Sequence, residues 1–434
     1  MIPVPEEDPK TAAIRVVSYN VLSSDLCEAD WHVKCSPQHL DQKNRLRKVM
    51  SKLDKEVEKD AVICLQEVST KWAGQLHCWF SDRDYHMVHM GYGGKFDGYM
   101  GVAMAFPLKT YKLQKCKIER PADLRRWPKP PSPGFRQRTL NWIKTSWRKF
   151  RNIKAPLDAI SDAKRRANQM IIMRLQERES GVGFMIGTYH MPCQFRVPQV
   201  MVIHMALALR ELQLAAQNTP LIFCGDFNVK PGDAPYLLVT EGSLPASHEH
   251  FPPPAVPGDK WQPKVEYAMR SAYKEALGAE PALTNWAFTR GSADDFKDTL
   301  DYIFVSQGIQ VESVEPVAAA AESQGPFPNA EEPSDHVLIA ADMTVTAAGN
   351  SDGRLGGRSS GRRGSDDEAQ LEAFRERVVA FMDDETKAEL SFTSSLNSFE
   401  RLLVHRLSEQ YGLYSASVGQ GRSRRITIYK EEVA

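Results

Sequence analysis

The sequence offers little material for covalent or metal cross-links. Its 434 residues contain seven cysteines, an odd number, and no two of them are spaced as C-x-x-C. This pattern indicates neither a disulfide framework nor a thiolate zinc site. It favours a reducing compartment, which we expect to be the cytoplasm, with the nucleus as the alternative.

Long apolar segments are also absent. The best candidate, residues 201–209, is much shorter than the roughly 18 residues that a membrane helix requires. The first ten residues, MIPVPEEDPK, are acidic and interrupted by proline, unlike a secretory signal or an Arg-rich transit peptide. We therefore expect a protein that does not engage a membrane.

The chain has no net charge, because 55 basic residues balance 55 acidic ones, but the charges are unevenly distributed. In the basic insert, about residues 120–166, 14 Lys or Arg face three Asp, and Trp and Phe are interleaved with the cations. Cations neutralise phosphates and aromatic rings stack on bases, so we expect this insert to contact RNA. A helical excursion whose rings pack on the protein body is the alternative. The candidate contacts are Arg148, Lys149 and Arg151.

Composition and periodicity divide the chain into three regions. Residues 12–346 alternate between short β-branched segments and amphipathic helical segments, which predicts an α/β domain. Residues 347–370 are rich in Gly, Ser and Arg and nearly devoid of large apolar side chains, which predicts a flexible linker. Residues 371–432 form a second, small unit. Strands are expected at 14–22, 61–67, 100–106, 169–175, 182–190, 221–228, 300–305 and 337–343, and helices at about 46–57 and 198–217.

Eight polar residues stand at or near the ends of the expected strands. Strand ends meet at one rim of a sheet, where binding sites usually form. Carboxylates on such rigid elements suit Mg²⁺, which takes few protein carboxylates and completes its shell with water and phosphate oxygens. Asn and His add hydrogen bonds suited to a phosphoryl oxygen and to proton transfer. The eight residues are Asn20, Glu67, His190, Asp226, Asn228, Asp301, Asp335 and His336.

The local sequences around these residues occur in the order SYN, LQE, a strand-ending His, GDFN, LDYIF and SDH. This order resembles the endonuclease/exonuclease/phosphatase superfamily, which has the DNase I-like fold, over about residues 12–346. The resemblance implies an α/β fold in which two β-sheets form a sandwich flanked by helices. It also implies Mg²⁺ as cofactor, with Mn²⁺ as a substitute.

The resemblance implies roles in binding the metal and the phosphate. Glu67 binds the metal with Asn20 beside it, and Asp335 is a further metal-side candidate. Asn228 and His190 hold the scissile phosphate. Whether one or two metal ions act stays open.

It also implies roles in proton transfer. Asp226 positions or deprotonates the attacking water, so it is either a base or a ligand. Asp301 pairs with His336, which stabilises the charged phosphorane or assists the leaving oxygen.

Within the superfamily, SYNVLSSDLC, FDGYMGVAMAF and TLDYIFVS followed by EPSDH resemble the deadenylase-type group, which includes nocturnin, Angel and 2',5'-phosphodiesterase. In that group an Asn and a Phe bind adenine, and the candidates here are Asn285 and Phe296. The inserted GSADD between them departs from the group's pattern, so Phe296 aligns better than Asn285. The alternative for Phe296 is a core aromatic.

The small C-terminal unit carries its own motif. Arg401 and His405 are four residues apart, so they share one face of an expected helix, and GLYSASVGQG and RRITIYK follow. This pattern resembles the R-3-H domain, a small α+β domain, and the resemblance implies binding of single-stranded nucleic acid. The candidate contacts are Arg401, His405, Arg422, Arg424 and Arg425.

These features together favour a metal-dependent nuclease acting on single-stranded RNA, in particular a 3'-exoribonuclease that removes poly(A). Alternatives with the same chemistry are a DNA or RNA endonuclease, a 2',5'-oligoadenylate phosphodiesterase and a nucleotide phosphatase. A catalytically weak RNA-binding adaptor is the alternative from another class. None of the expected catalytic residues is missing, which argues against the adaptor. The sequence predicts neither protein partners nor an oligomeric state.

Overall fold

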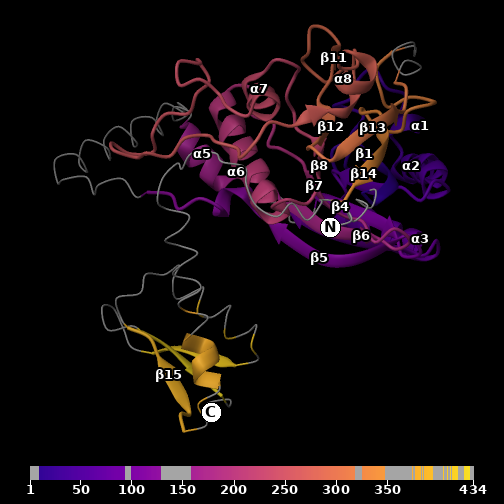
Figure 1. Cartoon of the computed structure of the whole chain (residues 1–434). Helices are drawn as coiled ribbons and strands as arrows, with labels where there is room; N and C mark the ends of the chain where they lie inside the picture. Colours follow the sequence, from indigo (N-terminus) through magenta and orange to yellow (C-terminus); the bar gives the residue numbers. More distant parts are fainter. Residues whose placement is uncertain are drawn as a thin grey trace, which may run out of the picture. The chain divides into compact units, whose positions relative to one another are not determined.

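The chain divides into two compact units, Met1–Ser351 and Asp352–Ala434 (Figure 1). No helix in the described part of the chain has the length and apolar character needed to cross a bilayer. The computed structural model describes residues 9–92, 99–128, 158–317 and 325–347, and in the C-terminal region residues 374, 377–382, 384, 386–393, 404, 408, 411, 413–418 and 425–430.

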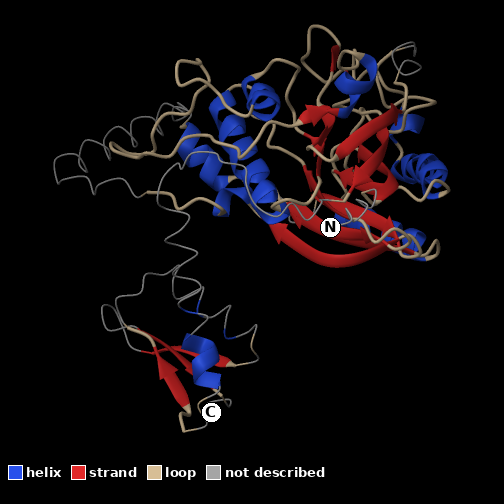
Figure 2. Ribbon diagram, in the orientation of Figure 1, coloured by secondary structure: helices blue, strands red, loops and turns tan. Residues whose placement is uncertain are grey.

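Two mixed six-stranded sheets build the first unit (Figure 2). The first sheet has the order β13 (Ile309–Val314), β14 (Ile339–Thr346), β1 (Thr11–Asn20), β2 (Val62–Gln66), β4 (Met100–Pro107) and β3 (Tyr85–Tyr92). The second sheet has the order β5 (Tyr111–Glu119), β6 (Met170–Glu177), β7 (Gly183–Tyr189), β8 (Leu221–Asp226), β12 (Asp301–Val305) and β9 (Arg270–Ser271). β1 runs parallel to β2 and β7 runs parallel to β8, whereas the other paired strands of these sheets are antiparallel.

The two sheets face each other across an apolar core, because alternate residues of each strand point inward. Val16 of β1 and Val62 of β2 meet Ile186 of β7 and Ile303 of β12 in this inner cluster. All four side chains are completely buried. The β-branched residues that mark the strands in the sequence therefore also hold the sheets together.

Helices cover the outer face of each sheet. α2 (Gln42–Val57) and α3 (Thr70–Ser81) pack on the first sheet, and α6 (Pro198–Ala216) and α7 (Ala234–Glu241) pack on the second. The expected sandwich of two sheets flanked by helices is therefore confirmed. Shorter helices are α1 (Pro37–Leu40), the 3-10 helix η1 (Pro121–Asp123), α5 (Ala159–Arg165) and α8 (Ala272–Leu277).

The eight expected strands correspond to β1, β2, β4, β6, β7, β8, β12 and β14, and the two expected helices correspond to α2 and α6. The other four strands of the two sheets, β3, β5, β9 and β13, were not expected, nor were the short paired strands β10 (Asn285–Ala287) and β11 (Phe296–Asp298). β5 and β13 carry polar, exposed residues such as Lys112 and Glu312, which weaken the apolar pattern of a strand. The last expected strand begins at Ile339, so Asp335 and His336 lie in the loop before it.

The second unit contains a three-stranded antiparallel sheet. Its order is β15 (Glu389–Ser391), β17 (Arg425–Tyr429) and β16 (Tyr414–Val418). The RRITIYK segment of the C-terminal motif contains β17. The described core of this unit consists of Phe374, Val378, Phe381, Phe392, Val404, Ile426 and Ile428.

Candidate active site

Strand pairing brings the expected catalytic residues to one rim of the two sheets. β1 ends with Asn20 and pairs in parallel with β2, which Glu67 follows. β7 and β8 are also parallel, and they end next to His190 and at Asp226. Asp226 is the direct cross-strand partner of Asp301, the first residue of β12. Residues far apart in the sequence therefore meet at the rim.

Glu67 occupies an unusual backbone conformation. Its φ of 58° lies in the left-handed region, which a residue with a side chain adopts at a cost in free energy and which often marks a functional site. Its Oε1 accepts a hydrogen bond from Asn20 Nδ2 at 3.2 Å, and its Oε2 accepts one from Ser23 N at 3.0 Å. Because Asn20 Oδ1 accepts from Leu22 N at 2.9 Å, Asn20 presents amide hydrogens to the site. It is therefore placed to orient carboxylates.

Asp226 lies at the centre of the cluster and is almost fully buried. Its Oδ2 accepts from Asn20 Nδ2 at 2.8 Å and lies 3.4 Å from His190 Nε2. Its Oδ1 accepts from Asn228 N at 2.9 Å. Burial raises the pKa of the Asp226 carboxyl, against the opposing positive charge of His336. An aspartate of this kind is a stronger base than an exposed one.

Asp301 and His336 form a buried pair. His336 Nδ1 donates to Asp301 Oδ2 at 2.7 Å, and His336 Nε2 lies 3.7 Å from Asp226 Oδ2. Burial alone would lower the pKa of His336, but the carboxylates of Asp301 and Asp226 outweigh it and raise that pKa well above its usual value. The hydroxyl of Thr284 donates to Asp301 Oδ2 at 2.6 Å and fixes the carboxylate. The pair therefore places an imidazolium at the rim.

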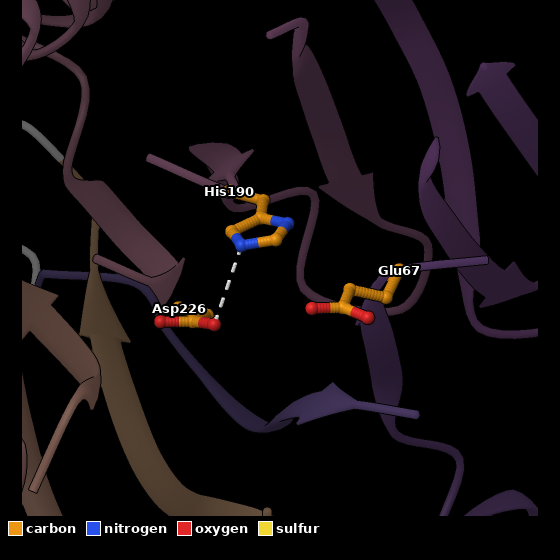
Figure 3. Close-up of side chains that lie close together, drawn as sticks. All are labelled: Glu67, His190 and Asp226. Atoms are coloured by element: carbon orange, nitrogen blue, oxygen red, sulfur yellow. Dashed lines mark ion pairs between the residues drawn. The ribbon is translucent and has the colours of Figure 1, made fainter. Parts of the chain in front are cut away.

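His190 is oriented by a residue from another strand. The hydroxyl of Tyr92, at the end of β3, lies 2.5 Å from His190 Nδ1, and Asn168 Nδ2 donates to the His190 carbonyl at 2.9 Å. Burial raises the pKa of Tyr92 well above its usual value, so the hydroxyl stays protonated. His190 Nε2 faces a carboxylate oxygen of Asp226, which accepts, so Nδ1 accepts from the Tyr92 hydroxyl. Nε2 then carries the ring hydrogen, on the side of Asp226. Figure 3 shows the His190 ring beside the carboxylates of Glu67 and Asp226.

Two groups of side chains place potential metal-ligand atoms within 4.8 Å of one another. The first is Glu67 with His190 and Asp226, and it offers the carboxylate oxygens that Mg²⁺ prefers. The second is Asp226 with Asp301 and His336. In the second group the protonated His336 has no lone pair left for a metal. His190 Nε2 likewise carries a hydrogen, so each group offers two carboxylates, but Asp301 Oδ2 already accepts from Thr284 and His336. Glu67 and Asp226 of the first group therefore fit Mg²⁺ better.

A pocket of about 1050 Å³ contains this cluster and both nucleobase candidates. Asn285 begins β10 (Asn285–Ala287), and Phe296 begins β11 (Phe296–Asp298), which pairs with β10. Asn285 is also bridged to His336. The Phe296 ring is 40% exposed, with Lys230 Nζ 5.1 Å from its centroid. Asn228, half-buried, and Asp335 line the same pocket.

Three supporting residues were missed by the sequence reasoning. Thr284 precedes Asn285, and Ser334 precedes Asp335, so both could have been found as polar neighbours within recognised motifs. Ser334 Oγ donates to the Asn20 carbonyl at 2.7 Å and accepts from the His336 amide at 3.2 Å. Tyr92 has no such signal, because it ends an unexpected strand and no motif surrounds it.

The basic insert is described only at residues 120–128 and 158–166. Within these residues Arg125 is buried, pairs with Asp259 and lies 4.1 Å from the ring centroid of Trp261. This part of the insert is therefore anchored to the protein body. Arg425 is exposed at the start of β17 in the second unit. The other expected RNA contacts lie outside the described residues: Arg148, Lys149, Arg151, Arg401, His405, Arg422 and Arg424.

Comparisons with known families match both parts of the chain. Residues 17–336 match the Endonuclease/Exonuclease/phosphatase family, and residues 369–430 match the R-3-H domain. The first match spans all eight strand-end residues. It covers well over half of the chain.

Individual relatives are more distant. Human 2',5'-phosphodiesterase 12 is 25% identical over 349 residues, which are 76% of this chain and 52% of that protein. The CCR4-Not complex 3'-5'-exoribonuclease subunit Ccr4 of Aspergillus niger is 35% identical over 136 residues, 30% of this chain and 19% of that protein. The chain thus spans about half the length of the first relative and a fifth of the second.

Among solved structures, ANGEL2, a 2',3'-cyclic phosphatase, has the same fold. The TM-score is 0.56 at 18% sequence identity, and the superposition covers 78% of this chain and 99% of that chain. At this identity the likeness bears on the fold alone.

Proposed function

This chain belongs to the endonuclease/exonuclease/phosphatase family and carries a C-terminal R-3-H domain, and on that premise we propose that it is a Mg²⁺-dependent phosphodiesterase that hydrolyses single-stranded RNA from the 3' end, with a preference for poly(A). One observation carries the proposal. A single pocket combines an oxygen-ligand group at Glu67 and Asp226 with an imidazolium held by Asp301. This combination serves phosphodiester hydrolysis, which needs an activated water and stabilised negative charge.

Glu67 and Asp226 would hold the metal ion. Mn²⁺ would substitute for Mg²⁺ because it takes the same oxygen ligands. When bound, the ion neutralises phosphate charge and lowers the pKa of a water molecule. Asn20 keeps both carboxylates in place through its amide hydrogens.

Asp226 is also the residue placed to receive the proton of the attacking water. Its raised pKa gives it the basicity for this step, and the hydrogen bonds from Asn20 and from the Asn228 backbone fix its orientation. Asp226 acts as base, as ligand, or as both. In each case its removal stops the reaction.

Two histidines and an asparagine face the phosphate. His336 presents Nε2–H beside Asp226, where it can stabilise the phosphorane or protonate the leaving oxygen. His190 presents Nε2–H to the same oxygen of Asp226, Oδ2. Asn228 Nδ2 donates one hydrogen to the Met191 carbonyl at 2.9 Å and keeps a second for a phosphate oxygen.

Three features support RNA and adenine as the substrate class. One relative is named as a 3'-5'-exoribonuclease. The exposed ring of Phe296 offers a stacking surface for a base, and Asn285, which is buried, lines the same pocket. The R-3-H domain belongs to a class that binds single-stranded nucleic acid, which suits a polymeric substrate.

A 2',5'-linked oligoadenylate is the second candidate substrate. It is favoured by the match to a 2',5'-phosphodiesterase, which covers 76% of this chain. The chemistry at phosphorus is the same for both linkages, so only the position of the attached ribose oxygen distinguishes them.

The test uses the purified full-length protein with Mg²⁺ on end-labelled oligo(A), mixed-sequence RNA, single-stranded DNA and 2',5'-linked oligoadenylate. We expect stepwise shortening of oligo(A) from its 3' end, faster than that of mixed RNA, and no reaction with EDTA. Faster cleavage of the 2',5' linkage would establish the second candidate. Internal cleavage, DNA cleavage or phosphate release alone would contradict the proposal.

A further inference from the structure

The pocket around the active site is lined by more carboxylates than cations. Besides the His336 imidazolium, its cations are Arg165, Arg166 and Lys230. One metal ion neutralises only part of this negative charge. The remaining carboxylates repel a polyanionic substrate. The lining carboxylates are Glu67, Asp162, Asp226, Asp233 and Asp335.

Arg166 is the one of these three cations that lacks a partner among the described residues. Lys230 pairs with Asp298 at 2.6 Å, and Arg165 pairs with Asp162. The Arg166 side chain makes no hydrogen bond or ion pair with a described residue, and its Nε is buried without a partner. A guanidinium without an acceptor is unfavourable, and this one lines the pocket, so it is placed to gain an anionic oxygen there.

The backbone that carries Arg166 is held firmly. Arg166 follows the last residue of α5, and Arg120 donates to the carbonyls of Arg166 at 2.8 Å and of Lys164 at 2.9 Å. These bonds satisfy helix-terminal carbonyls that would otherwise lack donors. Two residues later, Asn168 ties the segment to the carbonyl of His190. The guanidinium is therefore presented from a rigid support linked to the catalytic loop.

Strand order places Arg166 on one side of the catalytic centre. Arg166 lies just before β6, and β6, β7, β8 and β12 are consecutive neighbours in the second sheet. Asp226 ends β8, and Phe296 precedes β12. Neighbouring strands are about 4.8 Å apart, so β6 and β8 are about 10 Å apart. An arginine side chain can span much of this distance. It can therefore contact the phosphate next to the scissile one when the scissile phosphate lies at Asp226.

The positive charge of Arg166 influences the pKa of a residue in the loop that follows His190. Burial, with the carboxylates of Asp226 and Glu67, raises the pKa of Cys193 to about 11, and Arg166 acts against this rise. Cys193 comes three residues after His190 and lines the same pocket. The guanidinium therefore lies close to the loop that holds the catalytic histidine.

Building on the proposed phosphodiesterase function, we propose that Arg166, with Arg165 beside it, binds the phosphate adjacent to the scissile phosphodiester, on the side of the active site away from Phe296. A guanidinium can bind a phosphate through two parallel hydrogen bonds, which suits this role better than an ammonium group. The substrate is then an oligonucleotide that places at least two phosphates in the pocket. A mononucleotide or a cyclic phosphate would leave the subsite empty.

The experiment compares three adenosine dinucleotides with the linkage that the enzyme hydrolyses: one without a terminal phosphate, one with a 5'-phosphate and one with a 3'-phosphate. We expect the wild-type protein to hydrolyse one of the two phosphorylated forms with a kcat/KM about 10- to 100-fold higher than the unphosphorylated form. Arg166→Gln should abolish this gain, so that the phosphorylated dinucleotide is hydrolysed no faster than the unphosphorylated one by the same variant. Arg166→Lys should restore part of it.

The matched control is Arg210→Gln, which removes the same charge from α6 outside the pocket, where Arg210 pairs with Glu266. This variant should keep the full gain. Equal kcat/KM values for the three substrates in the wild-type protein would overturn the subsite, whatever the variants do. So would a gain that survives in Arg166→Gln. Failure of the wild-type protein to hydrolyse any of the three would instead overturn the proposed function itself.

Discussion

Two buried histidines in different regions of the catalytic unit are held in opposite charge states. His336, at the rim, is paired with Asp301, and its pKa is raised well above the usual value. His204, inside α6, receives a hydrogen bond from the Tyr189 hydroxyl at Nδ1 (2.8 Å) and donates from Nε2 to the Ala163 carbonyl (2.9 Å). Burial lowers the pKa of His204 to about 4. Both side chains are nearly inaccessible to solvent.

The difference shows that neighbours, rather than burial, decide the charge of a histidine in this fold. Burial acts against the charged form in both regions. Only at the rim do two carboxylates, Asp301 and Asp226, outweigh it. The hydrogen-bond partners of His204 are neutral and the charged groups that act on it, Arg166 and Arg120, are positive, so the ring stays neutral and serves as a packing and hydrogen-bonding element. A concentration of buried carboxylates is therefore what distinguishes the reactive rim from the structural interior.

The largest expected effect on kcat comes from giving His336 a neutral partner, like the partners of His204. Asp301→Asn replaces the carboxylate by a neutral amide, so His336 loses the partner that favours its charged form. We expect kcat for oligo(A) to fall by about 10³-fold, the scale typical for losing a group that stabilises the transition state. Steady-state kinetics of oligo(A) hydrolysis measure this change in kcat.

Asp54→Asn is the control for that substitution, since Asp54 pairs with Arg83 on the surface at 3.0 Å and lies outside the pocket. It should retain wild-type kcat. An Asp301→Asn enzyme within a few-fold of wild type would show that the charged pair does not act in the reaction.

The interior histidine makes a prediction about stability and pH. The pKa of His204 is about 4 in the folded protein and about 6.5 in an unfolded chain, so the unfolded chain binds a proton first as pH falls. The stability that depends on neutral His204 is complete above pH 6.5 and is lost as pH falls toward 4. Between pH 7.5 and pH 5 we expect a loss of about 2 kcal/mol from this residue.

His204→Gln tests this prediction, because an amide can donate to Ala163 and accept from Tyr189 without titrating. The fall in the free energy of unfolding between pH 7.5 and pH 5, measured by urea denaturation, should be about 2 kcal/mol smaller in the variant. Parallel stability curves for the two proteins would contradict the assignment.

A smaller effect is expected where a neutral partner orients a catalytic group. Tyr92→Phe removes the hydroxyl that holds His190 Nδ1 and keeps the ring. We expect kcat to fall about tenfold with KM nearly unchanged, which is the scale of one hydrogen bond. Tyr236→Phe, which deletes a hydroxyl bonded to Glu280 at 2.8 Å away from the pocket, should lower stability and leave kcat unchanged. Equal kcat values for the two variants would contradict a positioning role for Tyr92.

The sequence predicted the polar residues at the strand ends better than the residues and strands that hold them in place. Glu67 and Asp226 could be recognised because each ends a short apolar segment within a local motif. The fold class followed from the same alternation of strands and helices. Neither the hydroxyl of Tyr92 nor the exposed strand β5 could be predicted, because the first depends on a contact across 98 residues and the second has a polar face.

Arg166 illustrates what the sequence could not predict about the basic insert. In the sequence it is one of 14 cations in a basic insert, and composition assigns the same role to all of them. The structure separates them, since Arg125 is buried against Asp259 whereas Arg166 lines the pocket of the candidate active site. Which cation faces which anion depends on sheet order, and local sequence does not encode that order.

The central claim is that the strand-end cluster is the catalytic centre of an RNA phosphodiesterase, and Glu67→Ala tests it most directly. The measurement is the single-turnover rate of Mg²⁺-dependent cleavage of labelled oligo(A), with the affinity for the same RNA measured in EDTA. We expect cleavage to fall below detection while affinity stays within about twofold of wild type, because the carboxylate holds the metal and the basic surfaces are untouched. Glu211→Ala, which removes a half-buried carboxylate of α6 that pairs with Lys117 outside the pocket, should cleave oligo(A) as wild type does. Near-normal cleavage by Glu67→Ala would contradict the claim.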